Sequence, residues 1–195
     1  MPICAISNEG DQLAAVGLEQ EDGVFKSTLN YFQTDTEQIV KTVDLGSELI
    51  YDLKYLTADT VCAIGETDAQ FFSADGDTIG AYSYEGSYLK DFDTNGDGFL
   101  TLSLNIYRTG NRYTLVTVDE TGREIASLYI GQEILGLSAC GKYVAVLTAE
   151  GLTIYNRSLE IYAQTVDIGS ATSVLMRKDG SAVLLGGGTG ELFVP

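Results

Sequence analysis

The sequence lacks histidine and tryptophan, and it has only two prolines and three cysteines among 195 residues. Without histidine, the chain has neither the commonest general base nor the commonest zinc ligand, and it cannot form a Ser-His-Asp or Cys-His catalytic arrangement. The cysteines, Cys4, Cys62 and Cys140, are far apart with no CxxC spacing, which argues against a disulfide framework and against a structural zinc site. Cys62 lies in the apolar run VCAIG and is predicted to be a small buried hydrophobic residue.

Basic residues are also scarce. Lys and Arg together number 11 against 28 Asp and Glu, which gives a formal net charge of −17. A surface of this charge repels nucleic acid and anionic lipid headgroups, so neither is predicted as a direct partner. The longest apolar runs are far shorter than the roughly 20 residues that a membrane-spanning helix needs. The residues after Met1 show neither the basic nor the apolar region of a signal peptide, so they predict no location in the cell.

What the sequence does contain is a repeat. The stretches QIVKTVDLG, at 38–46, and EIYAQTVDIG, at 160–169, alternate apolar and polar residues and end on a glycine. Weaker copies end at Gly86 and Gly131, so the closing glycines are 40, 45 and 38 residues apart. A repeat of about 40 to 50 residues made of short strands is typical of β-propeller blades. We therefore predict an all-β fold of the β-propeller class.

The predicted architecture is a single propeller domain over residues 1–195, with four complete four-stranded antiparallel blades and a partial fifth. The blades are expected at about 3–46, 47–86, 87–131, 132–169 and 170–195. The second strand of each blade is the most apolar, as in VCAIG and YVAVL, which indicates a strand covered on both faces. The fourth strands alternate more regularly, as outer strands with one wet face do. Within the blades, polar turns predict hairpins near Asp35, Asp75, Glu120 and Arg157.

The fifth predicted blade has no segment for a fourth strand after Leu192–Val194. An apolar edge of this kind is open to pairing with another strand. We therefore expect an open arc of blades rather than a closed five-bladed ring. We also expect the chain to be part of a longer propeller of seven or eight blades. Such open edges would also allow self-association of the chain.

One segment matches half of a calcium loop. Asp93-Thr94-Asn95-Gly96-Asp97-Gly98 has the D-x-N-x-D-G pattern that opens an EF-hand loop, in which alternate side-chain oxygens bind calcium. The twelfth position, where the loop needs a glutamate, is Leu104, and the predicted flanks are strands rather than helices. Asp93, Asn95 and Asp97 are therefore predicted to belong to an acidic turn that binds no metal.

Other features also have a structural and a functional interpretation. Gly186–Gly190 is similar to a phosphate-binding loop, but neither a lysine nor a helix follows it, so a flexible turn is predicted. Glu19, Glu21 and Asp22 form an acidic cluster that is predicted to be a solvated loop. The 12 tyrosines could line a face that binds sugar or peptide, although tyrosine is also a good strand residue. No residue is therefore assigned a catalytic, cofactor-binding or metal-binding role, and no cofactor is predicted.

The repeat also carries a resemblance. The segment YNRSLEIYAQTVDIG, at 155–169, resembles blades of WD-repeat-like and quinoprotein-like propellers. The chain lacks their tryptophan-containing motifs, because it contains no tryptophan. As a whole it is similar to a group of uncharacterised bacterial propellers that are usually tethered outside the cell membrane by an N-terminal helix. The resemblance implies an extracytoplasmic, membrane-tethered protein, and it supplies no catalytic residues.

Two functions of different class follow. The first is a non-catalytic binding or scaffolding propeller, part of a cell-envelope protein, with a protein or a carbohydrate as its ligand and no direct membrane contact from this segment. The second is a carbohydrate-active enzyme, a glycosidase or lyase, with acidic residues at the mouth of a central channel. Two carboxylates roughly 5 to 9 Å apart in that channel would favour the enzyme.

Overall fold

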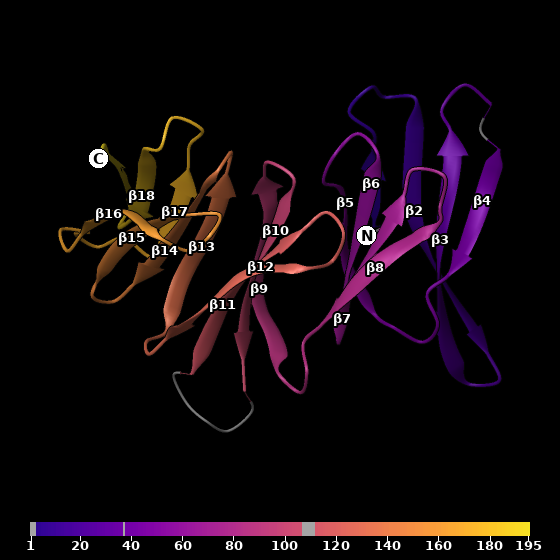
Figure 1. The fold of residues 1–195 in the computed structure, drawn as a ribbon, viewed down its shortest axis with the longest axis horizontal. Helices are drawn as coiled ribbons and strands as arrows, with labels where there is room; N and C mark the ends of the chain where they lie inside the picture. Colours follow the sequence, from indigo (N-terminus) through magenta and orange to yellow (C-terminus); the bar gives the residue numbers. More distant parts are fainter. Residues whose placement is uncertain (1–2, 37, 107–111) are drawn as a thin grey trace. The chain divides into compact units, whose positions relative to one another are not determined.

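The computed structural model of the chain describes residues 3–36, 38–106 and 112–195 (Figure 1). These residues form nineteen β-strands and no helix, which confirms the all-β prediction. It follows that none of the described residues belongs to a helix long and apolar enough to cross a membrane.

The strands form five antiparallel sheets, and neighbours in the chain are also neighbours in the sheet. Sheet one contains β1 (Cys4–Ile6), β2 (Gln12–Glu21), β3 (Val24–Gln33) and β4 (Ile39–Asp44). Sheet two contains β5 (Ile50–Tyr55), β6 (Thr60–Gly65), β7 (Asp68–Ser73) and β8 (Thr78–Ser83). Sheet three contains β9 (Tyr88–Gly96), β10 (Phe99–Asn105), β11 (Tyr113–Asp119) and β12 (Glu124–Ile130). Sheet four contains β13 (Ile134–Cys140), β14 (Tyr143–Thr148), β15 (Gly151–Asn156) and β16 (Ile161–Thr165), and sheet five β17 (Ser173–Met176), β18 (Ala182–Gly186) and β19 (Thr189–Phe193).

Because successive strands of a sheet alternate in direction, the turns of each sheet fall at two opposite ends. The link end holds the hairpin between the second and third strands and the segments that link one sheet to the next. The hairpin end holds the turn between the first and second strands and the turn between the third and fourth. The predicted hairpins lie at the hairpin end, near Asp35, Asp75, Glu120 and Arg157, and the strand pairing confirms them.

The chain divides into two compact units. Unit one consists of the residues up to Glu85 together with Glu120–Arg123 and holds sheets one and two, whereas sheets three to five belong to unit two. Unit one has a core between its two sheets. Unit two has one core between sheets three and four and another between sheets four and five. The prediction that all five sheets belong to one partial propeller over residues 1–195, and that this propeller is longer than the chain, stays a prediction.

Sheet four shows why its second strand is apolar from Tyr143 to Leu147. Val144 and Val146 of β14 pack in the core with sheet three, whereas Ala145 and Leu147 pack in the core with sheet five. A strand with two apolar neighbours cannot alternate in polarity. β6 and β10 are buried along their whole length. The fourth strands of the four complete sheets contain only exposed and half-buried positions, as predicted for outer strands with one wet face.

Side-chain hydrogen bonds join neighbouring sheets in unit two. The Thr117 hydroxyl of β11 donates to the carbonyl of Arg157 in sheet four, at 2.7 Å. Between sheets four and five, the backbone N–H of Met176 donates to the hydroxyl of Ser138, at 3.0 Å. Because these bonds have fixed directions, they set the alignment of faces that apolar packing alone would leave free to slide.

Glycines end two of the second strands where a linking segment crosses them. A Cβ on Gly65 would come within 2.6 to 2.7 Å of the Glu48 side chain, in the segment between sheets one and two. A Cβ on Gly186 would overlap the backbone carbonyl of Ser170, in the segment between sheets four and five. The glycine of the VCAIG and AVLLG runs is therefore a packing requirement of the links between sheets.

The acidic cluster is one place where the sequence prediction was wrong. β2 continues to Glu21 and β3 begins at Val24, so Glu19 belongs to a strand and not to a solvated loop. The turn consists of Asp22 and Gly23, with φ values of 51° and 82°. Two successive left-handed residues are what a type I′ hairpin requires, and this turn lets the strands stay paired up to the tip.

Candidate functional site

The segment that matches a calcium loop is not a loop in the structure. β9 runs on through Asp93 to Gly96, so the predicted turn at Asp93–Gly98 was too long and only Asp97 and Gly98 turn the chain into β10. Gly96 forms a parallel bridge with Gly141 of unit two, which holds the end of β9 against sheet four. A contact with a residue far away in the sequence therefore extends β9 beyond the point where the local sequence predicts a turn.

Both carboxylate oxygens of Asp93 already accept hydrogen bonds. One oxygen accepts from the backbone N–H of Asn95, at 2.7 Å, and from its side-chain amide, at 2.8 Å. The other accepts from the backbone N–H of Ala139 in β13, at 2.9 Å. Asp93 therefore joins sheet three to sheet four. Among the described residues, no group of three or more Asp, Glu or Cys side chains is placed to hold a metal ion.

The calcium prediction stays open to a direct test. Calcium added to protein treated with a chelator should leave the melting temperature unchanged, because Asp93 would have to give up the hydrogen bonds that hold Asn95 and Ala139. Tight binding would raise the free energy of unfolding by about 2.7 kcal/mol at a hundredfold excess over the dissociation constant. A rise of about 5 to 10 °C in a thermal melt, the corresponding shift, would contradict the prediction.

The glycine-rich segment is a tight hairpin between β18 and β19. Gly187 and Gly188 form the turn, with φ values of 60° and 78°, and Thr189 already belongs to β19. The turn is therefore shorter than the predicted Gly186–Gly190. No helix among the described residues follows the segment, so it lacks the helix N-terminus on which a phosphate-binding loop depends.

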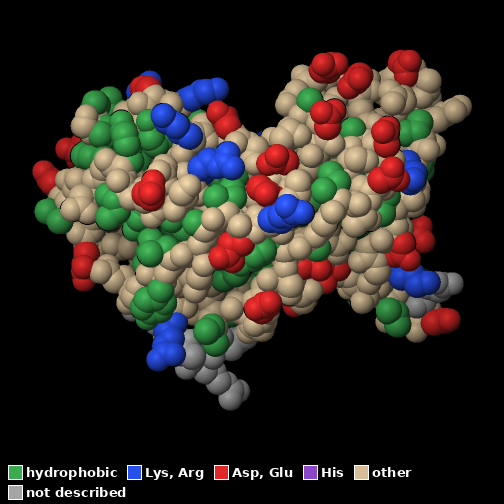
Figure 2. Space-filling view, in the orientation of Figure 1, with side chains coloured by type: hydrophobic (Ala, Val, Ile, Leu, Met, Phe, Trp, Pro, Cys, Tyr) green, Lys and Arg blue, Asp and Glu red, His purple; other side chains and the backbone are tan. Residues whose placement is uncertain are grey.

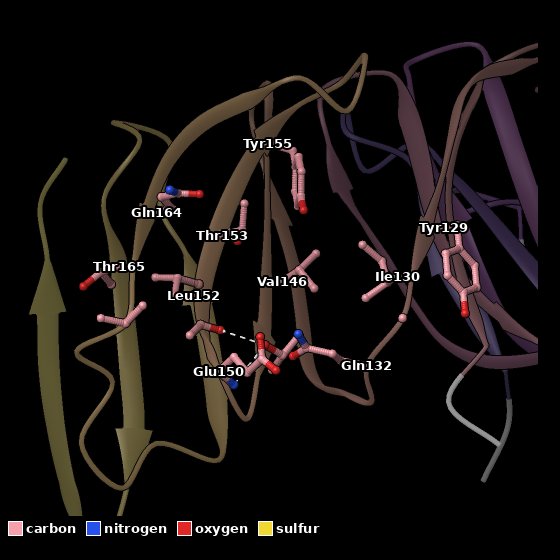
Figure 3. A pocket seen from close by; sticks show the side chains of 14 residues that line it. Tyr129, Ile130, Gln132, Val146, Glu150, Leu152, Thr153, Tyr155, Gln164 and Thr165 are labelled. Carbon is pink, nitrogen blue, oxygen red and sulfur yellow. Dashed lines mark hydrogen bonds between the residues drawn. The ribbon is translucent and has the colours of Figure 1, made fainter.

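A cavity of unit two has a volume of about 640 Å³ and lies at the link end, between β12 and sheet four (Figure 3). Tyr129, Ile130 and Gln132 line one side, at the end of β12 and in the link that follows it. The β14–β15 hairpin and the last residues of β16 line the other side. This volume is within the range of about 300 to 1,000 Å³ that is usual for small-molecule sites.

The lining of this cavity is neutral, polar and aromatic. Sheet four contributes apolar, hydroxyl and amide side chains: Val146, Leu152, Thr148, Thr153, Thr165, Tyr155 and Gln164. Among the described lining residues, Glu150 carries the only charge, and it is exposed on the hairpin turn. Burial raises the pKa of Tyr155, so its hydroxyl stays protonated at neutral pH and can donate. The cavity can therefore offer hydrogen bonds to an uncharged ligand.

Gln132 supplies an unused acceptor in this cavity. Its side-chain oxygen is buried and has no hydrogen-bond partner among the described residues. A buried polar atom without a partner costs about 1 to 3 kcal/mol, so a ligand that donates a hydrogen bond to this oxygen, once the side chain turns into the cavity, would recover part of that cost. Figure 3 shows Gln132 at the same end of the cavity as Glu150.

Tyr129 provides an aromatic surface at the edge of the cavity. Its side chain is 62% exposed, although tyrosine rings are usually covered on at least one face. A Cβ on Gly131 would lie 3.6 Å from the Tyr129 ring, so the ring rests close to the backbone of the link. An exposed ring of this kind can stack against a flat, apolar ligand face.

Sequence reasoning did not identify this cavity. Its residues come from β12, β14, β15 and β16, and the alternating pattern that predicts those strands treats each of them as ordinary strand or turn residues. The suggestion that tyrosines could line a binding face was the one signal that pointed this way. It did not select Tyr129 and Tyr155 from the other ten tyrosines.

Carboxylates gather instead around a smaller cavity of about 290 Å³, at the hairpin end of sheets one and two in unit one. The acidic residues that line it are Glu9, Asp11, Asp59 and Asp75. Gln12 supports this region, because its amide oxygen accepts from the Tyr55 hydroxyl at 2.7 Å and its amide nitrogen donates to the carbonyl of Ala74 at 2.9 Å. The chain thus has a neutral cavity in unit two and an acidic one in unit one.

Comparison with solved structures identifies the fold. The chain superposes on the crystal structure of the RRP9 WD40 repeats with a TM-score of 0.54 at 12% identity, over 94% of this chain and 72% of that one. For the structure of U3-55K the TM-score is 0.54 at 12% identity, over 94% and 73% of the two chains. For the Pan2 WD40 domain of Neurospora crassa it is 0.55 at 14% identity, over 96% and 56%. The sheets of this chain are therefore β-propeller blades, four of them complete and one with three strands.

At the level of sequence, residues 3–174 match the model of a family described as a family of unknown function, DUF5711. None of the curated proteins matches the chain. The matched range covers the first four sheets and reaches into β17 of the fifth.

Proposed function

This chain belongs to the DUF5711 family, whose function is unknown, and we propose that it is a non-catalytic binding module that holds an uncharged ligand in the cavity beside β12. The β-propeller fold agrees with such a role, since many blades placed side by side offer large binding surfaces at their turns. The single observation that carries the proposal is the lining of that cavity, in which hydroxyl, amide and tyrosine side chains surround one exposed carboxylate.

The same lining argues for holding a ligand rather than changing it. A glycosidase uses two carboxylates on either side of the bond that it cleaves. Among the described residues of the neutral cavity, Glu150 has no second carboxylate opposite it. The chain also has no histidine that could serve as a general base. A neutral saccharide or a stretch of peptide backbone has the uncharged donors and acceptors that the lining would complement. A place in the cell envelope, which the family resemblance implies, remains part of the proposal.

The proposal predicts selective binding of uncharged probes. In saturation-transfer NMR, methyl β-glucoside or N-acetylglycinamide should receive saturation from the protein, whereas glucuronate should not, because the Glu150 carboxylate repels it and no cation among the described lining residues attracts it. Tyr129→Ala should weaken binding about two- to tenfold, the equivalent of one aromatic contact of roughly 0.5–1.5 kcal/mol. Gln132→Leu should weaken it as well, because the unused acceptor is lost.

Tyr51→Ala is the matched control, because Tyr51 is 46% exposed and lies in sheet two. It should leave the NMR signals unchanged. Equal binding by the wild type and by Tyr129→Ala combined with Gln132→Leu would show that the cavity is not the site. Release of nitrophenol from nitrophenyl glycosides, which tests the enzyme alternative, would contradict a non-catalytic role.

A further inference from the structure

Sheets four and five carry a concentration of basic side chains at the hairpin end, opposite to the neutral cavity. Lys142 lies in the turn between β13 and β14, Arg157 in the turn between β15 and β16, and Arg177 and Lys178 in the turn between β17 and β18. These four residues, the basic surface, are all exposed and account for four of the 11 lysines and arginines of a chain with a net charge of −17. Figure 2 shows Lys and Arg side chains gathered in the upper left of the view, over the C-terminal sheets of Figure 1.

Close contacts join the β13–β14 turn to the β17–β18 turn. A Cβ on Gly141 would lie 3.3 Å from the Lys178 side chain, so the turn that carries Lys142 rests against the turn that carries Lys178. A Cβ on Gly180 would lie 3.2 to 3.3 Å from the rings of Tyr162 and Tyr143. The turns that carry Lys142 and Lys178 are therefore held side by side by the packing of sheet five on sheet four.

A pair of tyrosines stands within this surface. The rings of Tyr143 and Tyr162 are 4.6 Å apart between centroids, and Tyr162 is 49% exposed. The ammonium group of Lys142 lies 5.3 Å from the centroid of the Tyr143 ring, within the range of a cation–π contact. The surface thus offers positive charge together with an exposed aromatic ring, the combination in which protein interfaces are enriched.

The acidic side chains of the same turns are already engaged. Asp179 accepts from the hydroxyl and the backbone N–H of Ser181, at 2.6 and 3.1 Å, and lies 3.5 Å from the guanidinium of Arg177. Glu160 accepts from the side-chain amide of Asn156, at 2.8 Å. Among the described residues, Lys142 and Lys178 have no carboxylate within ion-pair distance. Two lysines of this surface therefore remain available to an incoming anion.

We propose that the basic surface docks a short acidic segment of a partner protein. Carboxylates of the segment would lie against Lys142 and Lys178, and an apolar or aromatic residue between them would pack on Tyr162. Charge complementarity supports this occupant, since four cations on adjacent turns match several carboxylates spaced along an extended peptide.

A short segment fits better than a membrane or a nucleic acid. Screening limits an exposed charge to about 8 Å at physiological ionic strength, so a peptide of a few residues would sense mainly the basic surface. An anionic bilayer or a long duplex would extend past it and meet the rest of a chain with 28 acidic residues. This inference is independent of the neutral cavity, because the two sites lie at opposite ends of sheet four.

The test uses the full chain and fluorescein-labelled hexaglutamate, followed by fluorescence anisotropy at low and at physiological salt. The peptide should bind at low salt, and its affinity should fall as salt rises. Lys142→Glu combined with Lys178→Glu should weaken binding at least tenfold, and Lys142→Met with Lys178→Met, which keeps the apolar stems, should give a smaller loss. Hexaserine and vesicles of phosphatidylserine should bind weakly or not at all.

Lys54→Glu combined with Lys90→Glu is the matched control, because it changes the net charge equally in sheets two and three. It should leave peptide binding close to that of the wild type. An equal loss in both double variants would mean that only the total charge matters, and the proposal would be wrong. Binding to vesicles but not to hexaglutamate would assign the surface to membranes and would also overturn the proposal. The absence of hexaglutamate binding at low salt would overturn it as well. Circular dichroism of each variant establishes that it is folded.

Discussion

Replacing Phe99 with alanine is expected to lower the free energy of unfolding by about 3–5 kcal/mol, the usual cost of removing a buried aromatic ring. Phe99 begins β10, is fully buried and packs in the core between sheets three and four. A Cβ on Gly96 would lie 2.6 Å from the Phe99 ring, so the ring lies directly against the end of β9. The backbones of two hydrogen-bonded sheets cannot move together to fill the space that the ring would leave.

Unfolding in urea, followed by circular dichroism, measures this effect. Phe25→Ala is the matched control, because Phe25 is 53% exposed on β3, and it should change stability by less than about 0.5 kcal/mol. If both variants lost the same amount of stability, the packing of sheet three on sheet four would not be the core that the structure describes.

The second large effect is expected at Asp93. Asp93→Ala should cost about 1.5–3 kcal/mol, because hydrogen bonds to a charged acceptor contribute in that range. The change removes the acceptor of two backbone N–H groups, those of Asn95 and Ala139, and so releases one of the bonds between β9 and β13. Asp93→Asn should recover only part of the loss, because the amide replaces one of the two accepting oxygens with a donor.

Asp97→Ala gives the control for that measurement in the same urea experiment. The side chain of Asp97 is exposed. Its backbone N–H donates a hydrogen bond to the carbonyl of Gly141, at 2.7 Å. Alanine retains that bond, so the loss should stay below about 0.5 kcal/mol. A loss at Asp97 as large as that at Asp93 would contradict the role given to the Asp93 carboxylate.

Local pattern was enough to predict most of the fold. The alternation in QIVKTVD and EIYAQT predicts outer strands, and the structure has β4 and β16 there. The uninterrupted apolar run of β6 predicts a strand with both faces covered, and all six of its residues are buried. These features depend on side chains that face one neighbour or two, and that information is contained in a few consecutive residues.

Features that depend on distant residues could not be predicted in this way. Asp93 was assigned to a turn because its chemistry suits turns, but its strand is prolonged by bonds to Ala139 and Gly141, more than 40 residues away. The polar residues Thr109-Gly110-Asn111 also predict a turn from sequence alone, and this segment lies outside the described residues. Neither the neutral cavity nor the basic surface has a local signal, because each is assembled from turns and strands of different repeats.

The two proposed sites would not compete with each other. The neutral cavity lies at the link end of sheet four, and the basic surface lies at its hairpin end. A ligand in the first and an acidic segment on the second would contact opposite ends of the same strands. A module that holds a small ligand and a protein partner at once is the arrangement that this geometry supports.

The most direct measurement of the central claim is methyl NMR of protein labelled at Ile, Leu and Val, titrated with methyl β-glucoside. The methyl groups of Ile130, Val146 and Leu152 line the neutral cavity, and their signals should shift together with one dissociation constant. Leu184, in the core between sheets four and five, should not shift. If the probe left the three cavity residues unchanged, or shifted only methyl groups elsewhere, the cavity beside β12 would not be the binding site.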